Sequence, residues 1–149
     1  MTIDPELVTR KLLLIAADLS ALESIRDRGA DSYLQHWVDQ AVVERYLERV
    51  IGRMIDVNYH VITASGHPPP ADYHASFERL AELGILDPPF AKRIARSAGL
   101  RNRLVHDYEG IDHAKVFAAL VDALEDVPQY LERINRQIGP PGDDDRRVG

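Results

Sequence analysis

The feature that most constrains the fold is a run of about 30 residues that opens at Asp31 and contains no proline before Pro68. Its apolar residues recur at spacings of three and four, the period of one face of a helix. They are Leu34, Val38, Ala41, Val42, Leu47, Val50, Ile51, Met54, Ile55, Val61 and Ile62. This stripe is wide for one neighbour, so we expect the long helix to pack on two. Trp37 and Tyr46 fit a core or an interface, and we expect the core.

Four further helices are expected around this long one. The first begins at Asp4–Pro5, a capping residue followed by proline, and ends at Arg28–Gly29. A short helix follows the proline-rich break at 66–70 and ends at Gly84. The residues expected to face inward are Val8, Leu12, Ile15, Leu19 and Leu22 in the first helix, and Tyr73, Phe77 and Leu80 in the short one.

Two more helices complete the chain. Asp87–Pro88 repeats the cap-then-proline signal and begins a helix whose apolar side is Phe90, Ile94 and Leu104. Asp112 is the expected cap of the last helix, in which apolar residues keep the helical spacing on both sides of Pro128. We expect Pro128 to kink this helix or to restart it with Asp126 as the new cap.

No stretch shows the alternation of a β-strand, and no internal repeat occurs. The sequence therefore predicts an all-α, up-down bundle of four to five helices. We place the helical domain at residues 1–138 and expect the Pro-, Gly- and Asp-rich tail, residues 139–149, to be disordered. Part of the first or second helix is expected to form the seam of a dimer.

Composition restricts the function classes. A length of 149 residues fits one domain, and the absence of cysteine excludes disulfide and thiolate chemistry. The start of the chain lacks the basic region of a signal peptide, and no apolar run approaches a membrane span. We therefore expect a soluble cytoplasmic protein with no membrane partner. The net charge of −6 argues against general nucleic-acid coating, so any RNA contact must be local.

One segment is locally basic. Residues 88–105 contain no Asp or Glu, and their cations are Lys92, Arg93, Arg96, Arg101 and Arg103. The segment leads into His106, and histidine is the side chain type whose ordinary pKa lies closest to neutral pH. A histidine can transfer the protons and an arginine can bind the phosphate oxygens that RNA cleavage by the 2′-hydroxyl involves. The same pattern also fits a charged, solvated helix end without catalysis.

This chemistry requires no metal and no other cofactor. The sequence offers no acidic cluster that would hold a divalent cation. His60, His67 and His74 are spaced by seven residues, but a proline-rich break separates the first from the last. We interpret them as surface histidines rather than as metal ligands.

The roles that we assign are specific to individual residues. His106 is the general base or acid, and Arg101 binds the scissile phosphate. Asn102 orients His106 or a phosphate, or is a plain surface residue. The remaining cations follow the RNA backbone or form a solvated face, and these are Lys92, Arg93, Arg96 and Arg103.

Geometry limits how Arg101 and His106 can cooperate. Five positions on one straight helix place the two side chains about 140° apart. They converge if the arginine wraps round the helix, if the helix loosens near Asp107, or if a two-fold dimer brings two such helices face to face.

The spacing R-x4-H-x-Y, together with the helical chain around it, resembles the HEPN superfamily and, within it, the HepT-type toxins. Arg101, Asn102, His106 and Tyr108 match that motif without a gap. The similarity spans roughly residues 5–137 and includes Glu44–Arg45, Ile55–Asp56 and the segment from Tyr73 to Leu86. The resemblance implies a dimeric helical ribonuclease whose two protomers share one cleft for RNA.

The resemblance also implies a role for Tyr108. In HepT-like proteins this tyrosine accepts AMP groups from an antitoxin partner, an MNT-domain nucleotidyltransferase. Phosphate added beside Arg101 would neutralise and block the site. The chain is thereby expected to be the toxin of a type VII-like toxin–antitoxin pair, as a homodimer or in a larger hetero-oligomer with its antitoxin.

Two alternatives stay open. The chain could be a non-catalytic HEPN module that binds a nucleotide or serves as the helper subunit of a nucleotidyltransferase. It could also be a structural helical protein in which the motif is only a charged helix end.

Overall fold

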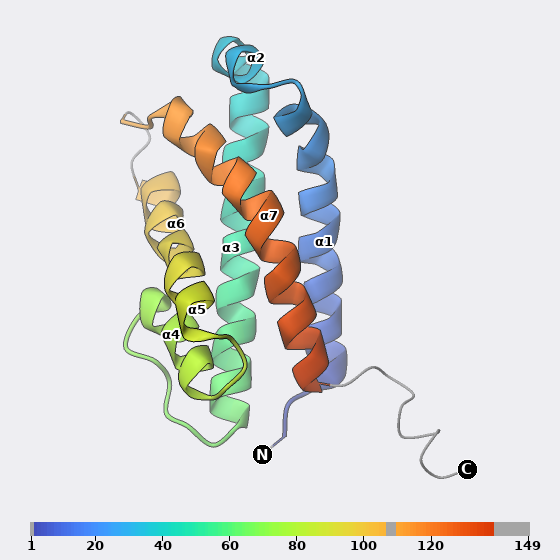
Figure 1. The fold of residues 1–149 in the computed structure, drawn as a ribbon, viewed down its shortest axis with the longest axis vertical. Helices are drawn as coiled ribbons and strands as arrows, with labels where there is room; N and C mark the ends of the chain where they lie inside the picture. The colour runs from blue at the N-terminus through green and yellow to red at the C-terminus, as the bar shows by residue number, and fades with distance from the viewer. Residues whose placement is uncertain (1, 107–109, 139–149) are drawn as a thin grey trace, which may run out of the picture.

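The computed structural model describes residues 2–106 and 110–138, and these residues form seven helices and no strand. The helices are α1 (Pro5–Asp27), α2 (Ala30–Gln35), α3 (Trp37–Ala64), α4 (Tyr73–Glu82), α5 (Pro88–Ile94), α6 (Arg96–His106) and α7 (His113–Ile138). Helix α1 runs up, α3 down, α6 up and α7 down, so α3 and α7 point the same way (Figure 1). Helices α4 and α6 pack against one side of α3, and α5 packs on α4 and α6. The expected all-α, up-down bundle is confirmed.

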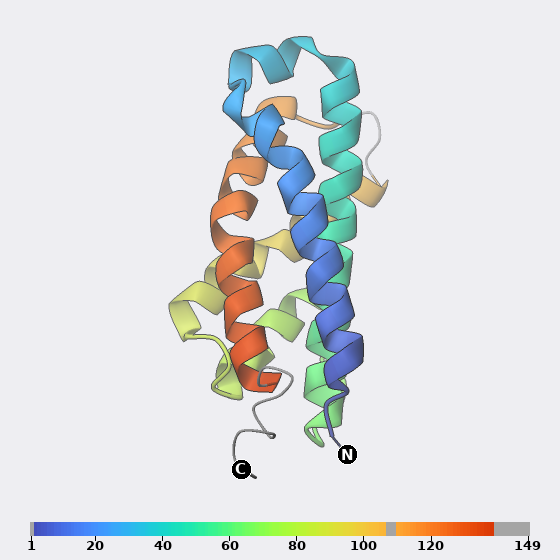
Figure 2. The same ribbon diagram turned by 90° about the vertical axis from the view of Figure 1, so that its right-hand side faces the viewer.

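The core lies where the three long helices meet. Figure 2 shows α1 nearest the viewer, with α7 on one side of it and α3 on the other. The apolar stripe predicted for the first helix is buried throughout, from Val8 to Leu22. Most of the α3 stripe is buried as well, against both α1 and α7. Each fully buried large aliphatic side chain contributes about 1.5–3 kcal/mol to this packing.

The helix limits follow local capping chemistry. The Asp4 carboxylate accepts hydrogen bonds from the backbone N–H groups of Glu6 and Leu7, each at 3.1 Å, as the sequence predicted. Asp112 caps α7 in the same way through Ala114 N at 3.0 Å. Gly29, which follows α1, has a φ of 88°, a left-handed conformation that glycine adopts without strain.

The long second helix is in fact two helices, which corrects the prediction. The chain breaks at His36, whose backbone is extended with φ −120° and ψ 95°. Side chains satisfy the carbonyl groups that the break exposes: His36 Nδ1 donates to Ser32 O at 2.6 Å, and Gln40 Nε2 donates to Tyr33 O at 3.0 Å. The break turns the apolar side chains beside it outward. Trp37 is 76% exposed, so its expected core position was wrong.

The beginning of the predicted stripe is exposed for the same reason, and the residues concerned are Leu34, Val38 and Ala41. The expected fourth helix is also divided, at Ala95, where Ala98 N bonds to Ala95 O at 3.1 Å. These two divisions account for seven helices in place of four to five. They leave the order and direction of the long helices unchanged.

Pro128 does not restart the last helix. Helix α7 continues unbroken through this proline (Figure 1). Asp126 is therefore not a new cap, and its carboxylate accepts hydrogen bonds from Arg93 instead.

A buried polar network ties α3, α4 and α7 together. Tyr130 of α7 donates its hydroxyl to Asn58 Oδ1, and Asn58 Nδ2 donates to Ser76 Oγ at 3.0 Å. Ser76 Oγ in turn donates to the carbonyl of Tyr73 at 2.7 Å. All three side chains of the network are buried, so each hydrogen bond satisfies a polar group that would otherwise lie unpaired in the core. The network fixes the first turn of α4 on α3.

Candidate functional site

Three residues of the motif, Arg101, Asn102 and His106, lie on α6, which has a buried side and an exposed side. Leu104 is buried, as predicted, together with Ala98. Arg101 is half-buried, whereas Asn102 and His106 are exposed. Two hollows flank the helix: one toward α3 and α4, which contains Arg101, and one toward α7. We call them the α3 hollow and the α7 groove.

The α3 hollow is an open cavity of about 530 Å³. Its lining residues are Arg49, Gly52, Arg53, Ile55, Asp56, Tyr59, Tyr73 and Arg101. The guanidinium carbon of Arg101 lies 5.2 Å from the ring centre of Tyr73, a cation–π contact. The side chain of Arg101 crosses α3 at Gly52, where an added Cβ would lie 3.9 Å from Arg101 Nε. The expectation that Tyr73 faces inward was wrong, since it is 39% exposed.

Sequence reasoning missed two arginines in this hollow, Arg49 and Arg53. They lie one turn apart on α3 and both contact Asp18 of α1, at 3.2 and 2.6 Å. Asp18 is 6% exposed and lies within the apolar stripe of α1. The sequence offered one signal for this cluster. It is a carboxylate within the apolar stripe of one helix together with two arginines spaced i,i+4 on another helix.

Tyr59 completes one wall of the hollow. Its ring packs edge-to-face with Tyr73 at a centroid distance of 6.1 Å. Burial, with smaller contributions from Tyr73 and Asp72, raises the pKa of the Tyr59 phenol above its ordinary value.

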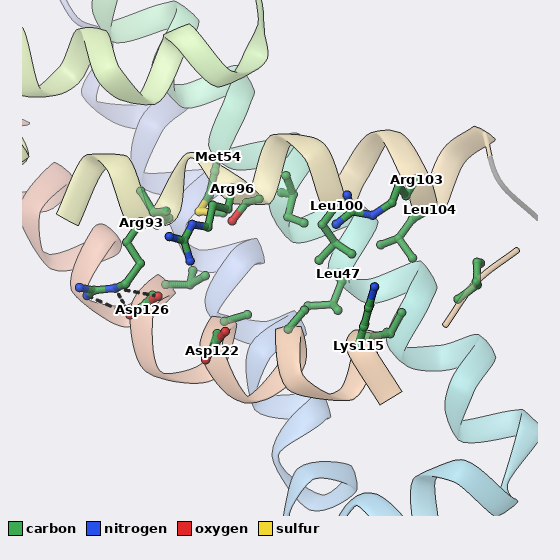
Figure 3. A pocket seen from close by; sticks show the side chains of 18 of the residues that line it. Leu47, Met54, Arg93, Arg96, Leu100, Arg103, Leu104, Lys115, Asp122 and Asp126 are labelled. Atoms are coloured by element: carbon green, nitrogen blue, oxygen red, sulfur yellow. Dashed lines mark hydrogen bonds and ion pairs between the residues drawn. The ribbon is translucent and has the colours of Figure 1, made fainter. Parts of the chain in front are cut away.

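The α7 groove has a volume of about 630 Å³ and lies between α6 and α7 (Figure 3). Leu47, Met54 and Leu100 contribute to an apolar floor. Arg96 and Arg103 lie on the α6 side, and Lys115 reaches from α7 toward the Arg103 end of the groove. Asp112, Asp122 and Asp126 line the same groove, so its cations lie among carboxylates and the groove has no uniform positive charge.

The predicted basic patch is therefore divided. Arg93 forms a forked ion pair with Asp126, with Nε to both carboxylate oxygens at 3.2 Å, so its charge is neutralised. Arg96 and Arg103 remain in the α7 groove without an ion pair among the described residues. Lys92 is exposed and is not among the residues found to line either hollow.

Within this chain Arg101 and His106 do not converge. Both belong to the continuous helix α6, and Arg101 is directed onto Tyr73 and α3. Among the described lining residues, neither hollow includes His106. Tyr108 lies outside the described residues, and so does the expected tail, 139–149.

No group of three or more acidic or histidine side chains able to hold a metal ion occurs among residues 2–106 and 110–138. Over the same residues, no helix has the length and apolar character needed to cross a membrane. Of the three evenly spaced histidines, His67 and His74 are exposed and His60 is half-buried. His60 Nε2 accepts a hydrogen bond from Asp4 N at 3.0 Å, which gives it a structural role.

Comparison with known proteins gives the family. The family described as "Ribonuclease HepT-like" matches residues 15–134. The chain belongs to this HepT-like family. A relative from Aphanizomenon flos-aquae (strain 2012/KM1/D3), a tRNA nuclease HepT, is 38% identical to this HepT-like chain over 141 residues, covering 91% of the chain and 92% of the relative. An mRNA nuclease HepT from Shewanella oneidensis is 24% identical over 132 residues, covering 89% and 98%.

Solved structures share the HepT-like fold. A toxin–antitoxin crystal structure with AMP-PNP contains a chain that matches with a TM-score of 0.81 and 23% identity, covering 88% of this chain and 98% of that one. A structure of a tri-AMPylated Shewanella oneidensis HEPN toxin in complex with an MNT antitoxin matches with a TM-score of 0.79 and 24% identity, covering 87% and 97%. The expected HEPN-like, HepT-like architecture is confirmed.

Proposed function

We propose that this HepT-like chain is the toxin of a toxin–antitoxin pair and that it is a metal-independent endoribonuclease. The observation that carries the proposal is the state of Arg101. Its guanidinium rests on an aromatic ring and, among the described residues, has no carboxylate partner. An arginine that is positioned but not neutralised is available to a phosphate. Similarity to a tRNA nuclease over nearly the whole chain supports RNA as the substrate.

The reaction follows from RNA chemistry. A base removes the proton of the 2′-hydroxyl, and the oxygen attacks the adjacent phosphorus. The bond from phosphorus to the 5′-oxygen breaks, and an acid protonates that oxygen. The products are a 2′,3′-cyclic phosphate and a 5′-hydroxyl. His106 acts as base or acid, and Arg101 binds the non-bridging oxygens as negative charge develops on them. Asn102, one turn before His106, orients the imidazole or a phosphate.

The proposed active unit is a symmetric dimer. One protomer directs Arg101 toward α3 and leaves His106 exposed at the end of α6. A two-fold axis beside α6 would bring the histidine of one protomer toward the arginine of the other and supply a second histidine. One imidazole could then serve as base and the other as acid. Sedimentation across a dilution series, with cleavage measured in parallel, tests this point, and a fully active monomer would contradict it.

The proposed regulation is adenylylation of Tyr108 by an MNT-domain nucleotidyltransferase. The phenol oxygen attacks the α-phosphorus of ATP, a phosphodiester to AMP forms, and pyrophosphate leaves. Tyr108 follows His106 by two positions, so the added charge and bulk lie next to the proton-transfer group. The Shewanella oneidensis complex, in which a tri-AMPylated HEPN toxin is bound to an MNT antitoxin, supports this form of regulation. Peptide mass mapping after co-expression tests it, and an inhibited toxin with unmodified Tyr108 would contradict it.

The decisive experiment uses protein made without its antitoxin, incubated with total RNA in EDTA. The wild type is expected to cleave, and His106→Ala to lose at least about 100-fold in rate. His67→Ala is the matched control, because His67 is exposed as His106 is, but lies in the connection between α3 and α4 rather than on α6. Equal rates for all three proteins would favour the alternative, a non-catalytic nucleotide-binding or helper module of a nucleotidyltransferase.

A further inference from the structure

The α3 hollow holds more positive charge than the motif provides. Arg49 and Arg53 project from one face of α3, and Gly52 lies between them on the same face. The side chain of Arg101 reaches that face at Gly52. Three guanidinium groups from two helices therefore share one cavity.

A single buried carboxylate anchors the two α3 arginines. Asp18 contacts Arg53 Nη1 at 2.6 Å through one oxygen and Arg49 Nη2 at 3.2 Å through the other. A buried carboxylate requires a cationic partner, but one arginine meets that requirement. The second arginine leaves the group with a net positive charge. The only acid among the described residues that line the hollow is Asp56, which pairs with Lys11.

Both α3 arginines keep donors for a ligand. Their side chains are 36% and 21% exposed, for Arg49 and Arg53 respectively. A guanidinium has five N–H donors, and the contact with Asp18 occupies only part of them. Since the carboxylate fixes both side chains before any ligand arrives, little conformational entropy is lost when an anion binds.

We propose that Arg49 and Arg53 form a second phosphate subsite, which binds the RNA backbone next to the scissile phosphate held by Arg101. Asp18 is the positioning residue that holds both arginines in place. This inference rests on the proposed ribonuclease function and deepens it, because the subsite defines the path of the RNA across α3 rather than along the α7 groove. The size of the cavity, about 530 Å³, suits a nucleotide unit.

The test measures RNA binding as a function of salt. Fluorescence anisotropy follows a labelled single-stranded oligoribonucleotide of mixed sequence, with every protein in the non-cleaving His106→Ala background. Arg53→Gln is expected to weaken binding about tenfold and to reduce the slope of log K against log salt by about one. Arg49→Gln is expected to act in the same direction, and Arg53→Lys to keep the slope.

Arg10→Gln is the matched control, because Arg10 is an exposed arginine of α1 that is not among the residues lining either hollow. The subsite is overturned if Arg49→Gln and Arg53→Gln both leave the affinity and the salt slope unchanged. The ribonuclease proposal still stands in that case if the protein with His106 intact cleaves RNA and His106→Ala does not. If His106→Ala does not bind RNA and the protein with His106 intact does not cleave it, both the subsite and the ribonuclease proposal are overturned. If Arg53→Gln does not fold, Arg49→Gln decides, because Asp18 then retains its closer partner.

Discussion

The ring of Tyr73 supports the guanidinium of Arg101 at 5.2 Å, so an aromatic residue of α4 positions the motif arginine of α6. An acidic partner would neutralise the charge, whereas a ring face attracts the cation and leaves its formal charge available. The buried network through Ser76, Asn58 and Tyr130 holds the backbone of Tyr73. The position of Arg101 thus depends on contacts that reach as far as α7.

Replacing Tyr73 with alanine should reduce RNA cleavage without unfolding the protein. An exposed cation–π contact contributes about 0.5–1 kcal/mol, which corresponds to a two- to fivefold loss in kcat/KM. Tyr73→Phe keeps the ring and should remain close to wild type. A rate for Tyr73→Ala equal to that of Tyr73→Phe would show that the ring does not position Arg101. Thermal melts of both variants provide the folding control, and small shifts are expected because Tyr73 is 39% exposed.

The buried network should be costly to break. Asn58→Ala removes one hydrogen-bond partner of Tyr130 and one of Ser76 in a fully buried position, and we expect a loss of about 2–4 kcal/mol in the free energy of unfolding. Tyr130→Phe removes one hydroxyl and should cost about 1–2 kcal/mol. Urea denaturation measures both. The exposed Asn135→Ala on α7 is the control, and an Asn58→Ala protein as stable as this control would contradict the argument.

The ion pair between Asp87 and Arg133 should make stability depend on acid pH. The hydrogen bond from Arg133 lowers the pKa of Asp87 below its ordinary value in the folded protein. A lowered folded-state pKa stabilises the protein above the unfolded-state pKa, about 3.9, and this contribution is lost as pH falls through the folded-state pKa. Arg133→Gln should therefore be less stable than wild type at pH 7, and the difference should shrink below about pH 4.

Urea unfolding of wild type and Arg133→Gln at several pH values measures this difference. Arg136→Gln is the matched control, because Arg136 is an exposed arginine near the end of α7 that pairs with Glu132. A difference between wild type and Arg133→Gln that stays constant from pH 7 to below pH 4 would contradict the assignment.

The sequence predicted elements wherever the determinant is local. Asp4–Pro5 and Gly29 mark the limits of α1, and the three- and four-residue spacing identifies the buried faces of α1 and α7. The break at His36 was missed because neither proline nor glycine marks it, and side-chain bonds to carbonyl groups of α2 stabilise it instead. Trp37 was misplaced as a consequence, since its burial depended on an unbroken helix.

The residues of the functional site show the same difference between local and tertiary determinants. Arg101 was found because its motif is contiguous along the chain. Arg49 and Arg53 were missed because their role depends on Asp18, 31 and 35 residues away in sequence, and on the approach of α6 to α3. The pairing of Arg93 with Asp126 was also not predictable, since it joins two helices that share no sequence pattern. Tertiary packing therefore decides which cations of a basic segment remain available to RNA.

Two substitutions at Gly52 distinguish an effect on the space inside the α3 hollow from an effect on the stability of α3. An added Cβ would lie 3.9 Å from Arg101 Nε, an ordinary contact distance, so alanine should fit without moving Arg101. Because glycine is about 1 kcal/mol less favourable than alanine inside a helix, Gly52→Ala should raise the free energy of unfolding by roughly 0.5–1 kcal/mol.

Gly52→Leu should gain similar helix stability but project into the hollow and displace Arg101 or an RNA phosphate. We therefore expect Gly52→Ala to keep cleavage and Gly52→Leu to lose at least about tenfold, a loss that follows from misplaced phosphate contacts. Equal cleavage by the two variants would mean that RNA does not enter the hollow, and a destabilised Gly52→Ala would mean that α6 approaches α3 more closely than the 3.9 Å contact allows.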